Sequence, residues 1–121
     1  MQKRILIVED NELNMKLFND LLEAHGYKTV QTRSGVEAVE LARQHKPDLI
    51  LMDIQLPLVD GYEATRRIKA DPELRSIPVI VVTSYALSGD DGKAHAAGCD
   101  AYVTKPYSPR QLLAKIKEFL P

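Results

Sequence analysis

Cysteine is nearly absent from this sequence, since Cys99 is the only one among 121 residues. A single cysteine excludes a disulfide within the chain, and we expect Cys99 to be a small apolar residue of the interior. Excess charge of either sign is missing too: 16 Lys and Arg residues oppose 17 Asp and Glu residues, which leaves a formal net charge of -1. This balance removes any global electrostatic case for binding nucleic acid or an anionic membrane.

Long hydrophobic runs are also missing. The apolar stretches are far too short to cross a bilayer, and residues 1–4 lead straight into a strand pattern, unlike a signal peptide. Repeats, linkers and low-complexity segments do not occur, while 45% hydrophobic and 27% charged residues are typical of a globular protein. We therefore expect one cytoplasmic domain over residues 1–121 that buries a substantial core, with no output domain.

What the sequence does contain is a regular alternation of strand and helix patterns. Compact apolar or β-branched runs predict strands at residues 4–9, 27–32, 49–52, 79–82 and 101–104. Apolar residues at helical spacing, with capping residues and glycines at the ends, predict helices over about 11–26, from 35, after 61, over about 88–97 and after 108. In the first helix, the residues that show this spacing are Leu13, Leu17, Leu21 and Leu22.

The strands at 4–9, 49–52 and 79–82 are apolar on both faces. Such strands, alternating with helices, imply a parallel sheet that helices cover on both sides. Right-handed crossovers and two-sided coverage require the winding to reverse at some point. In the common five-stranded arrangement, which is flavodoxin-like with the order 2-1-3-4-5, the reversal lies between strands one and three, and ligands bind at the carboxyl ends beside it. We expect this α/β sandwich, of the (βα)5 type, here.

Acidic residues stand where the strands on either side of this reversal end. The first strand ends in Glu9 and Asp10, and the third, in the run LILMDIQLP, ends in Asp53. Three carboxylates at one edge would repel one another. Mg²⁺, which accepts carboxylate, carbonyl and water oxygens at about 2.1 Å, would remove that repulsion. Each acid alone is more simply a helix cap or a loop residue, but three at adjacent strand ends favour a magnesium site.

Two further strand ends add a hydroxyl and a cation. The fourth strand ends in VVTS, which brings Thr83 to the same edge, and the fifth ends in VTKP, which brings Lys105 there. An ammonium is a compact charge suited to a phosphate oxygen. Together with the acids, these groups suit phosphoryl transfer to a carboxylate, in which Asp53 attacks phosphorus while Mg²⁺ and Lys105 spread the charge.

Five separated motifs make the chain resemble a known family over its whole length. They are VEDN at residues 8–11, LILMDIQLP at 49–57, DGYE at 60–63, VVTS at 81–84 and VTKP at 103–106. In order and spacing they resemble the receiver domain of bacterial response regulators. The stretches EDNELNMKLF and PDLILMDIQLP are more similar still to stand-alone receivers of the DivK type, which relay cell-cycle and division signals.

The resemblance implies a role for each matching residue. Asp53 would be the phosphoacceptor. Glu9 and Asp10 would hold Mg²⁺, directly or through water, together with Asp53 and the main-chain carbonyl of Gln55. Lys105 would contact the acyl phosphate, and Pro106 would follow a cis peptide bond, which only an X-Pro bond adopts at low cost.

A switch is expected next to the phosphorylated residue. The hydroxyl of Thr83 could turn toward the phosphoryl group, which opens space that Tyr102 could fill, and in the family a Thr and an aromatic residue at these positions act as a coupled pair. The alternative for Tyr102 is a static amphipathic ring at the sheet edge. The moving face would comprise the fourth helix, the fifth strand and the fifth helix. Gln55 and Tyr85 would flank the path of attacking water and set the lifetime of the phosphate.

The partners expected from this family are a histidine kinase or a histidine phosphotransferase as donor and a downstream protein as target, with neither nucleic acid nor membrane insertion. The chain would be a monomer or a weak dimer, and a phosphoacceptor that catalyses its own phosphorylation and dephosphorylation without being a turnover enzyme.

Three other classes remain as alternatives. A hydrolase with an aspartate nucleophile normally has a second aspartate two residues later, where this chain has Gln55. A flavodoxin-like nucleotide binder needs a first loop that accepts phosphate, whereas EDNELN is acidic. A pseudo-receiver would bind partners constitutively, against which the intact Asp53, Thr83 and Lys105 argue.

Overall fold

The computed structural model describes residues 2–54, 56, 59–83, 98–104 and 108–120. Its strands are β1 (Arg4–Val8), β2 (Lys28–Thr32), β3 (Leu49–Asp53), β4 (Val79–Thr83) and β5 (Ala101–Thr104). Its helices are α1 (Glu12–Ala24), α2 (Gly35–His45), α3 (Gly61–Ala70) and α5 (Pro109–Phe119). The helix predicted for residues 88–97 lies outside the described residues.

The five strands form one parallel sheet in the order β2-β1-β3-β4-β5, which confirms the predicted topology. In the centre of the sheet Ile5 is opposite Leu49, and the register continues to the pair Val8 and Met52. On the other side of β3, Asp53 is opposite Val82. The winding therefore reverses between β1 and β3, as predicted, and the strands on both sides of the reversal reach the same edge.

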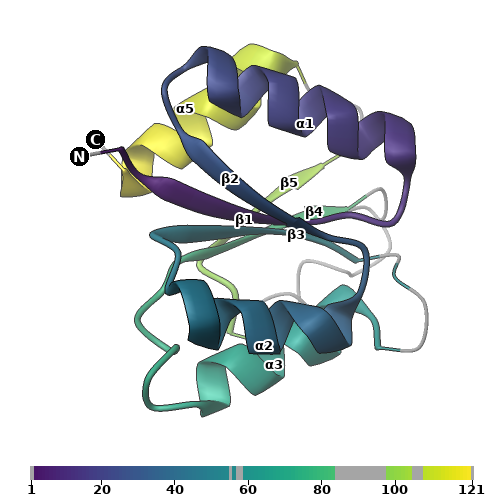
Figure 1. Cartoon of the computed structure of the whole chain (residues 1–121), viewed down its shortest axis with the longest axis vertical. Helices are drawn as coiled ribbons and strands as arrows, with labels where there is room; N and C mark the ends of the chain where they lie inside the picture. The colour runs from purple at the N-terminus through teal and green to yellow at the C-terminus, as the bar shows by residue number, and fades with distance from the viewer. Residues whose placement is uncertain (1, 55, 57–58, 84–97, 105–107, 121) are drawn as a thin grey trace.

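Helices cover both faces of the sheet: α1 and α5 lie on one side and α2 and α3 on the other (Figure 1). Successive side chains of a strand point to opposite faces, so each central strand contributes side chains to two hydrophobic cores. Ile5, Ile7, Leu49 and Leu51 pack with α1 and α5, whereas the residues between them pack with α2 and α3. All five residues of β3 are buried. This two-sided burial is the reason why the strand sequences are apolar without alternation.

Two of the four leucines in the helical pattern of α1, Leu13 and Leu17, lie away from the sheet, whereas Leu22 is buried. Leu13 and Leu17 are 65% and 58% exposed, and the residues that pack on the sheet include Met15, Phe18 and Leu22. Positions 15, 18 and 22 follow the i, i+3, i+7 spacing of a helix face, whereas residues 13 and 17 form a separate line one turn apart. The spacing of the leucines alone could not show which of these two lines of residues faces the sheet, because both lines have helical periodicity.

Strand ends also differ slightly from the predicted ranges. Glu9 and Tyr27 lie outside β1 and β2, and Asp53 lies inside β3 as its last residue.

Cys99 is half-buried against the core beside α2 and α3, as predicted, and burial raises the pKa of its thiol. Among the described residues, no helix combines the length and the apolar character that crossing a membrane requires.

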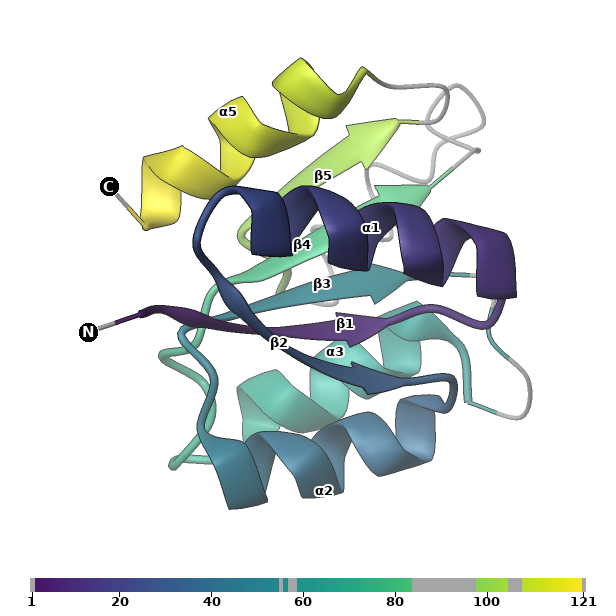
Figure 2. The same cartoon turned by 45° about the horizontal axis from the view of Figure 1, so that its top comes forward.

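Every described helix begins at the carboxyl edge of the sheet (Figure 2). Each has an N-cap side chain that accepts a main-chain N–H from the first turn, and these residues are Asn11, Ser34, Asp60 and Ser108. At the other end of α1, Gly26 has a φ of +87°, a left-handed conformation that glycine adopts without steric cost. The local sequence thus fixes where each helix starts, and all starts surround one edge.

Candidate functional site

Two buried carboxylates lie at the ends of neighbouring central strands. Glu9 follows β1 and is 1% exposed, and Asp53 ends β3 and is 5% exposed. Both come directly after the paired residues Val8 and Met52, and neighbouring strands are about 4.8 Å apart. Asp53 is also in phase with Leu49 and Leu51, which pack toward α1 and α5. The register therefore places these two acids side by side at the carboxyl edge of the sheet.

The carboxylate of Glu9 is held by the first turn of α1. Its Oε1 atom accepts the main-chain N–H of Asn11 at 3.4 Å and the side-chain amide of Asn14 at 3.1 Å. The main-chain N–H of Glu9 donates to the carbonyl of Thr32 at 3.0 Å, which extends the β1–β2 pairing by one residue. These contacts fix the position of the Glu9 carboxylate at the end of β1.

A glycine is required beside Asp53. A Cβ atom on Gly61 would lie 2.2 Å from the carbonyl oxygen of Asp53, which is closer than any real Cβ contact. The N–H of Gly61 donates to the carbonyl of Ile54 at 3.0 Å, and the hydroxyl of Thr65 donates to the carbonyl of Gly61 at 2.7 Å. The start of α3 is thus pressed against the end of β3. Sequence analysis found the DGYE motif but not this role of its glycine.

The other predicted site residues fall into two groups. Asp10 is exposed in the turn before α1, Thr83 is the last residue of β4, and Tyr102, opposite Val81 in β5, is 39% exposed. The remaining predicted residues, for phosphate contact, metal binding, lifetime control and the cis peptide bond, lie outside the described residues; they are Gln55, Tyr85, Lys105 and Pro106.

The donor chemistry of Glu9 and Asp53 fits Mg²⁺. This ion usually takes one or two protein carboxylates and completes its shell with carbonyl oxygens and water. Within the described ranges, no group of three or more His, Cys, Asp or Glu side chains is assembled to hold a metal. A single cation shared by Glu9, Asp10 and Asp53 therefore stays a prediction. The two buried acids at the ends of adjacent strands are enough for an ion that needs only one or two protein carboxylates.

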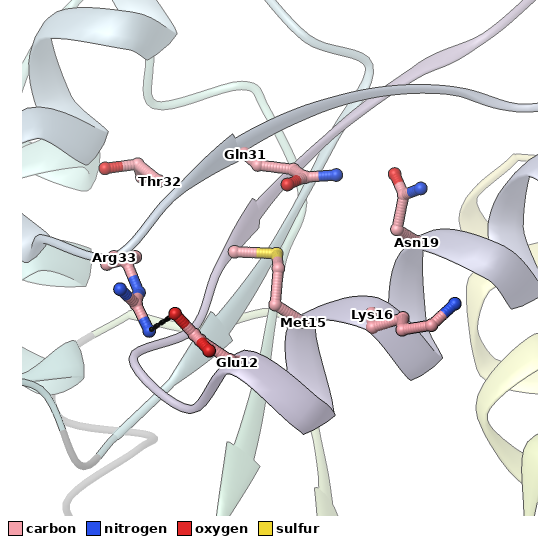
Figure 3. Close-up of a pocket in the computed structure, with 7 residues that line it drawn as sticks. All are labelled: Glu12, Met15, Lys16, Asn19, Gln31, Thr32 and Arg33. Atoms are coloured by element: carbon pink, nitrogen blue, oxygen red, sulfur yellow. Dashed lines mark ion pairs between the residues drawn. The ribbon is translucent and has the colours of Figure 1, made fainter.

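A surface pocket of about 490 Å³ lies between α1 and β2, next to this edge (Figure 3). Its lining includes Glu12 and Arg33, which form an ion pair at 3.3 Å, together with Thr32 and Met15. The side chains of Glu12 and Arg33 are 84% and 55% exposed, and pairs of this kind contribute little to stability. None of the predicted site residues lines the pocket. The candidate site is therefore the strand ends themselves rather than this cavity.

Comparison with known proteins decides the family. A model of the response regulator receiver domain matches residues 5–117. The chain belongs to this family. The polar-differentiation response regulator DivK of Brucella ovis is 58% identical over 120 residues, which cover 99% of this chain and 98% of that protein. The chain is thus a DivK-like receiver, and receivers of this kind are signalling modules that work with kinases and phosphotransfer partners in two-component systems.

Solved receiver structures agree with the fold. The receiver domain of the sensor histidine kinase PA1611 from Pseudomonas aeruginosa PAO1 superimposes with a TM-score of 0.93 at 36% identity, covering 99% of this chain and 98% of that one. That structure holds a magnesium ion coordinated in its active-site cleft. The phosphorylated cyanobacterial phytochrome response regulator RcpA gives a TM-score of 0.84 at 33% identity, with 98% and 91% coverage. The family therefore includes members with Mg²⁺ and with phosphate.

Proposed function

We propose that this receiver accepts a phosphoryl group on Asp53 and thereby changes its binding to a protein partner. The observation that carries the proposal is the burial of Asp53 at the end of the central strand β3, beside Glu9 at the end of β1. These two acids lie at the carboxyl ends of adjacent parallel strands, beside the reversal of the winding, where ligands bind in sheets of this type. Binding of a cation would use both carboxylates, and transfer of a phosphoryl group would use Asp53.

The transfer would be a displacement at phosphorus. A carboxylate oxygen of Asp53 forms the new P–O bond while the P–N bond of a phosphohistidine breaks, and the imidazole leaves with the electron pair and takes up a proton. Lys105 and the hydroxyl of Thr83 would hold phosphoryl oxygens. Mg²⁺, held by Glu9, Asp10, Asp53 and the main-chain carbonyl of Gln55, would neutralise charge that develops on these oxygens.

The acyl phosphate would act through the neighbouring strands. Phosphorylation adds about -1.5 to -2 charges and strong acceptor oxygens, which would draw the hydroxyl of Thr83 inward and let Tyr102 follow. The partly exposed ring of Tyr102 and its place opposite Val81 support this role. The responding surface would be residues 88–97, β5 and α5. Gln55 and Tyr85 would set the lifetime of the phosphate, and a cis bond before Pro106 would turn the chain.

The phosphoryl donor would be a histidine kinase or phosphotransferase in the cytoplasm, and the target a protein that acts in cell-cycle control. The similarity to DivK, a polar-differentiation response regulator, supports that pathway class. We propose that the chain acts as a monomer or weak dimer. A constitutive interaction module is less favoured, because such a module would bind its partner without using Asp53.

The test is incubation with acetyl phosphate and Mg²⁺, followed by measurement of the intact mass. We expect a gain of one phosphoryl group in the wild-type protein, and no gain in Asp53→Asn or when EDTA replaces Mg²⁺. Asp48→Asn is the matched control, because Asp48 immediately precedes the same strand at its other end, and it should be labelled like the wild type. A folded wild-type protein that gains no mass would favour the constitutive module.

A further inference from the structure

The N-terminus of α1 is capped in an unusual way. Asn11 is the N-cap, and its side chain accepts the N–H of Asn14 at 3.0 Å. In a capping box, the residue at the position of Asn14 returns this bond to the main-chain N–H of the N-cap, as Gln111 does for Ser108 in α5 at 2.9 Å. In α1 the N–H of Asn11 instead donates to Glu9, outside the helix.

The side chain of Asn14 is thereby released for a different contact. Its amide donates to the same Oε1 atom of Glu9, and at 3.1 Å this bond is shorter than the 3.4 Å bond from Asn11. The three residues form a closed ring of hydrogen bonds: Asn14 to Asn11, Asn11 to Glu9, and Asn14 to Glu9. Two donors on one oxygen restrict the rotation of the carboxylate, which is almost completely buried.

We propose that Asn14 is a positioning residue for the cation site, and that it acts by orienting the carboxylate of Glu9. The inference rests on the proposed function, because it takes Mg²⁺ as the ligand of Glu9. Residues that hydrogen-bond a metal ligand fix its orientation and typically change metal affinity about 10- to 100-fold when they are removed. Asn14 fits this role because its hydrogen bond to Glu9 is direct and part-buried and does not depend on the cation.

The length of the Glu9 side chain also contributes to its contact with Asn14. An aspartate at position 9 would be shorter by one methylene group, so its carboxylate would end farther from the amide of Asn14. The pairing of Glu9 with Asn14 therefore explains why a longer acid can stand beside Asp10. It also ties the cation to the first turn of α1, so that binding and capping stabilise each other.

The experiment measures Mg²⁺ binding to the unphosphorylated protein by isothermal titration calorimetry. We expect Asn14→Ala to weaken binding about 10-fold, and Asn14→Asp, which keeps the shape but loses the amide donor, to weaken it at least as much. Asn19→Ala is the matched control: Asn19 lies on the same helix, but its side chain bonds to Glu23 and Thr29 instead of Glu9. This control should bind Mg²⁺ within about twofold of the wild type even if it is less stable.

A double-mutant cycle separates positioning from general destabilisation. In the Glu9→Asp background, Asn14→Ala should have no further effect on Mg²⁺ affinity, because the contact is already lost. Equal losses of affinity for Asn14→Ala in both backgrounds would overturn the inference, as would wild-type affinity in a folded Asn14→Ala protein. Absence of Mg²⁺ binding by the wild type would instead overturn the cation site of the proposed function, and the inference with it.

Discussion

The two ends of the sheet use acidic residues in opposite ways. At the amino end, Asp48 accepts the N–H of Arg4 and Asp100 accepts the N–H of Val79, each at 2.8 Å, where β1 and β4 begin. Asp100 also pairs with Lys69 at 2.7 Å. At the carboxyl end, Glu9 directly after β1 and Asp53 at the end of β3 are both buried. Asp48 and Asp100 fix the starts of strands through main-chain hydrogen bonds, whereas Glu9 and Asp53 bring two buried carboxylates to one edge of the sheet.

The helices strengthen this contrast. All four described helices begin at the carboxyl end, where their N-termini carry partial positive charge and favour anions. Their C-termini reach the amino end, where Lys69, near the end of α3, donates to the carbonyls of Arg75 and Ile77 as well as to Asp100. The amino end thus holds stabilising hydrogen bonds and an ion pair, whereas the carboxyl end carries the proposed phosphorylation site, so substitutions at the two ends should separate folding from phosphorylation.

The largest effect is expected for Gly61→Ala at the carboxyl end. The added Cβ would meet the carbonyl of Asp53, so we expect the free energy of unfolding in urea to fall by about 3 kcal/mol. Phosphorylation by acetyl phosphate should fall too, because the clash displaces Asp53. Gly26→Ala is the control: its φ is positive but its Cβ meets nothing within 4 Å. A Gly61→Ala protein as stable as Gly26→Ala would contradict the tight contact.

At the amino end, Asp100→Ala should lower stability without altering phosphorylation. The substitution removes the acceptor of the Val79 N–H and the partner of Lys69, which we expect to cost about 2 kcal/mol in urea unfolding. Asp20→Ala, which breaks an exposed pair with Lys16, should cost less than about 0.5 kcal/mol. Reduced phosphorylation of a folded Asp100→Ala protein would contradict the proposal that residues of the amino end affect stability but not phosphorylation.

A smaller effect is expected for Ser108→Ala, which removes the cap of α5. The hydroxyl of Ser108 accepts the N–H of Gln111 at 3.1 Å, and loss of such a cap costs about 1 kcal/mol. Ser108→Thr keeps an acceptor oxygen and should recover most of the loss in thermal unfolding. Since Ser108 lies at the same end as Asp53, unchanged phosphorylation in Ser108→Ala would show that position at this end does not by itself make a residue functional.

The smallest effect concerns pH. The N–H of Glu73 and the guanidinium of Arg43 hold the pKa of Asp71 below its ordinary value of 3.8. Because the folded-state pKa is the lower one, the stabilisation is present above pH 3.8 and is lost as the pH falls through the folded value. The difference in Tm between wild type and Asp71→Asn should therefore shrink between pH 6 and pH 3. A constant difference would exclude this linkage.

Sequence reasoning predicted a parallel sheet covered on both sides because its strands are apolar on both faces, and it took the strand order from the common five-stranded arrangement. It also predicted that Glu9 and Asp53 approach each other, which follows from the strand order alone. It did not find Asn14 or the role of Gly61. An asparagine three residues after an N-cap asparagine was visible in the sequence, but its partner depends on the angle at which the chain turns from β1 into α1.

By itself, the sequence determined which of the described segments are strands and helices, and which acids end the central strands, because hydrophobic periodicity and capping are local properties. Only the tertiary structure decided that Met15 and Phe18, rather than Leu13 and Leu17, face the sheet. It also decided that Asn14 meets Glu9 and that Gly61 presses on Asp53. These contacts depend on how neighbouring elements are oriented, and packing of the whole sheet against its helices sets that orientation.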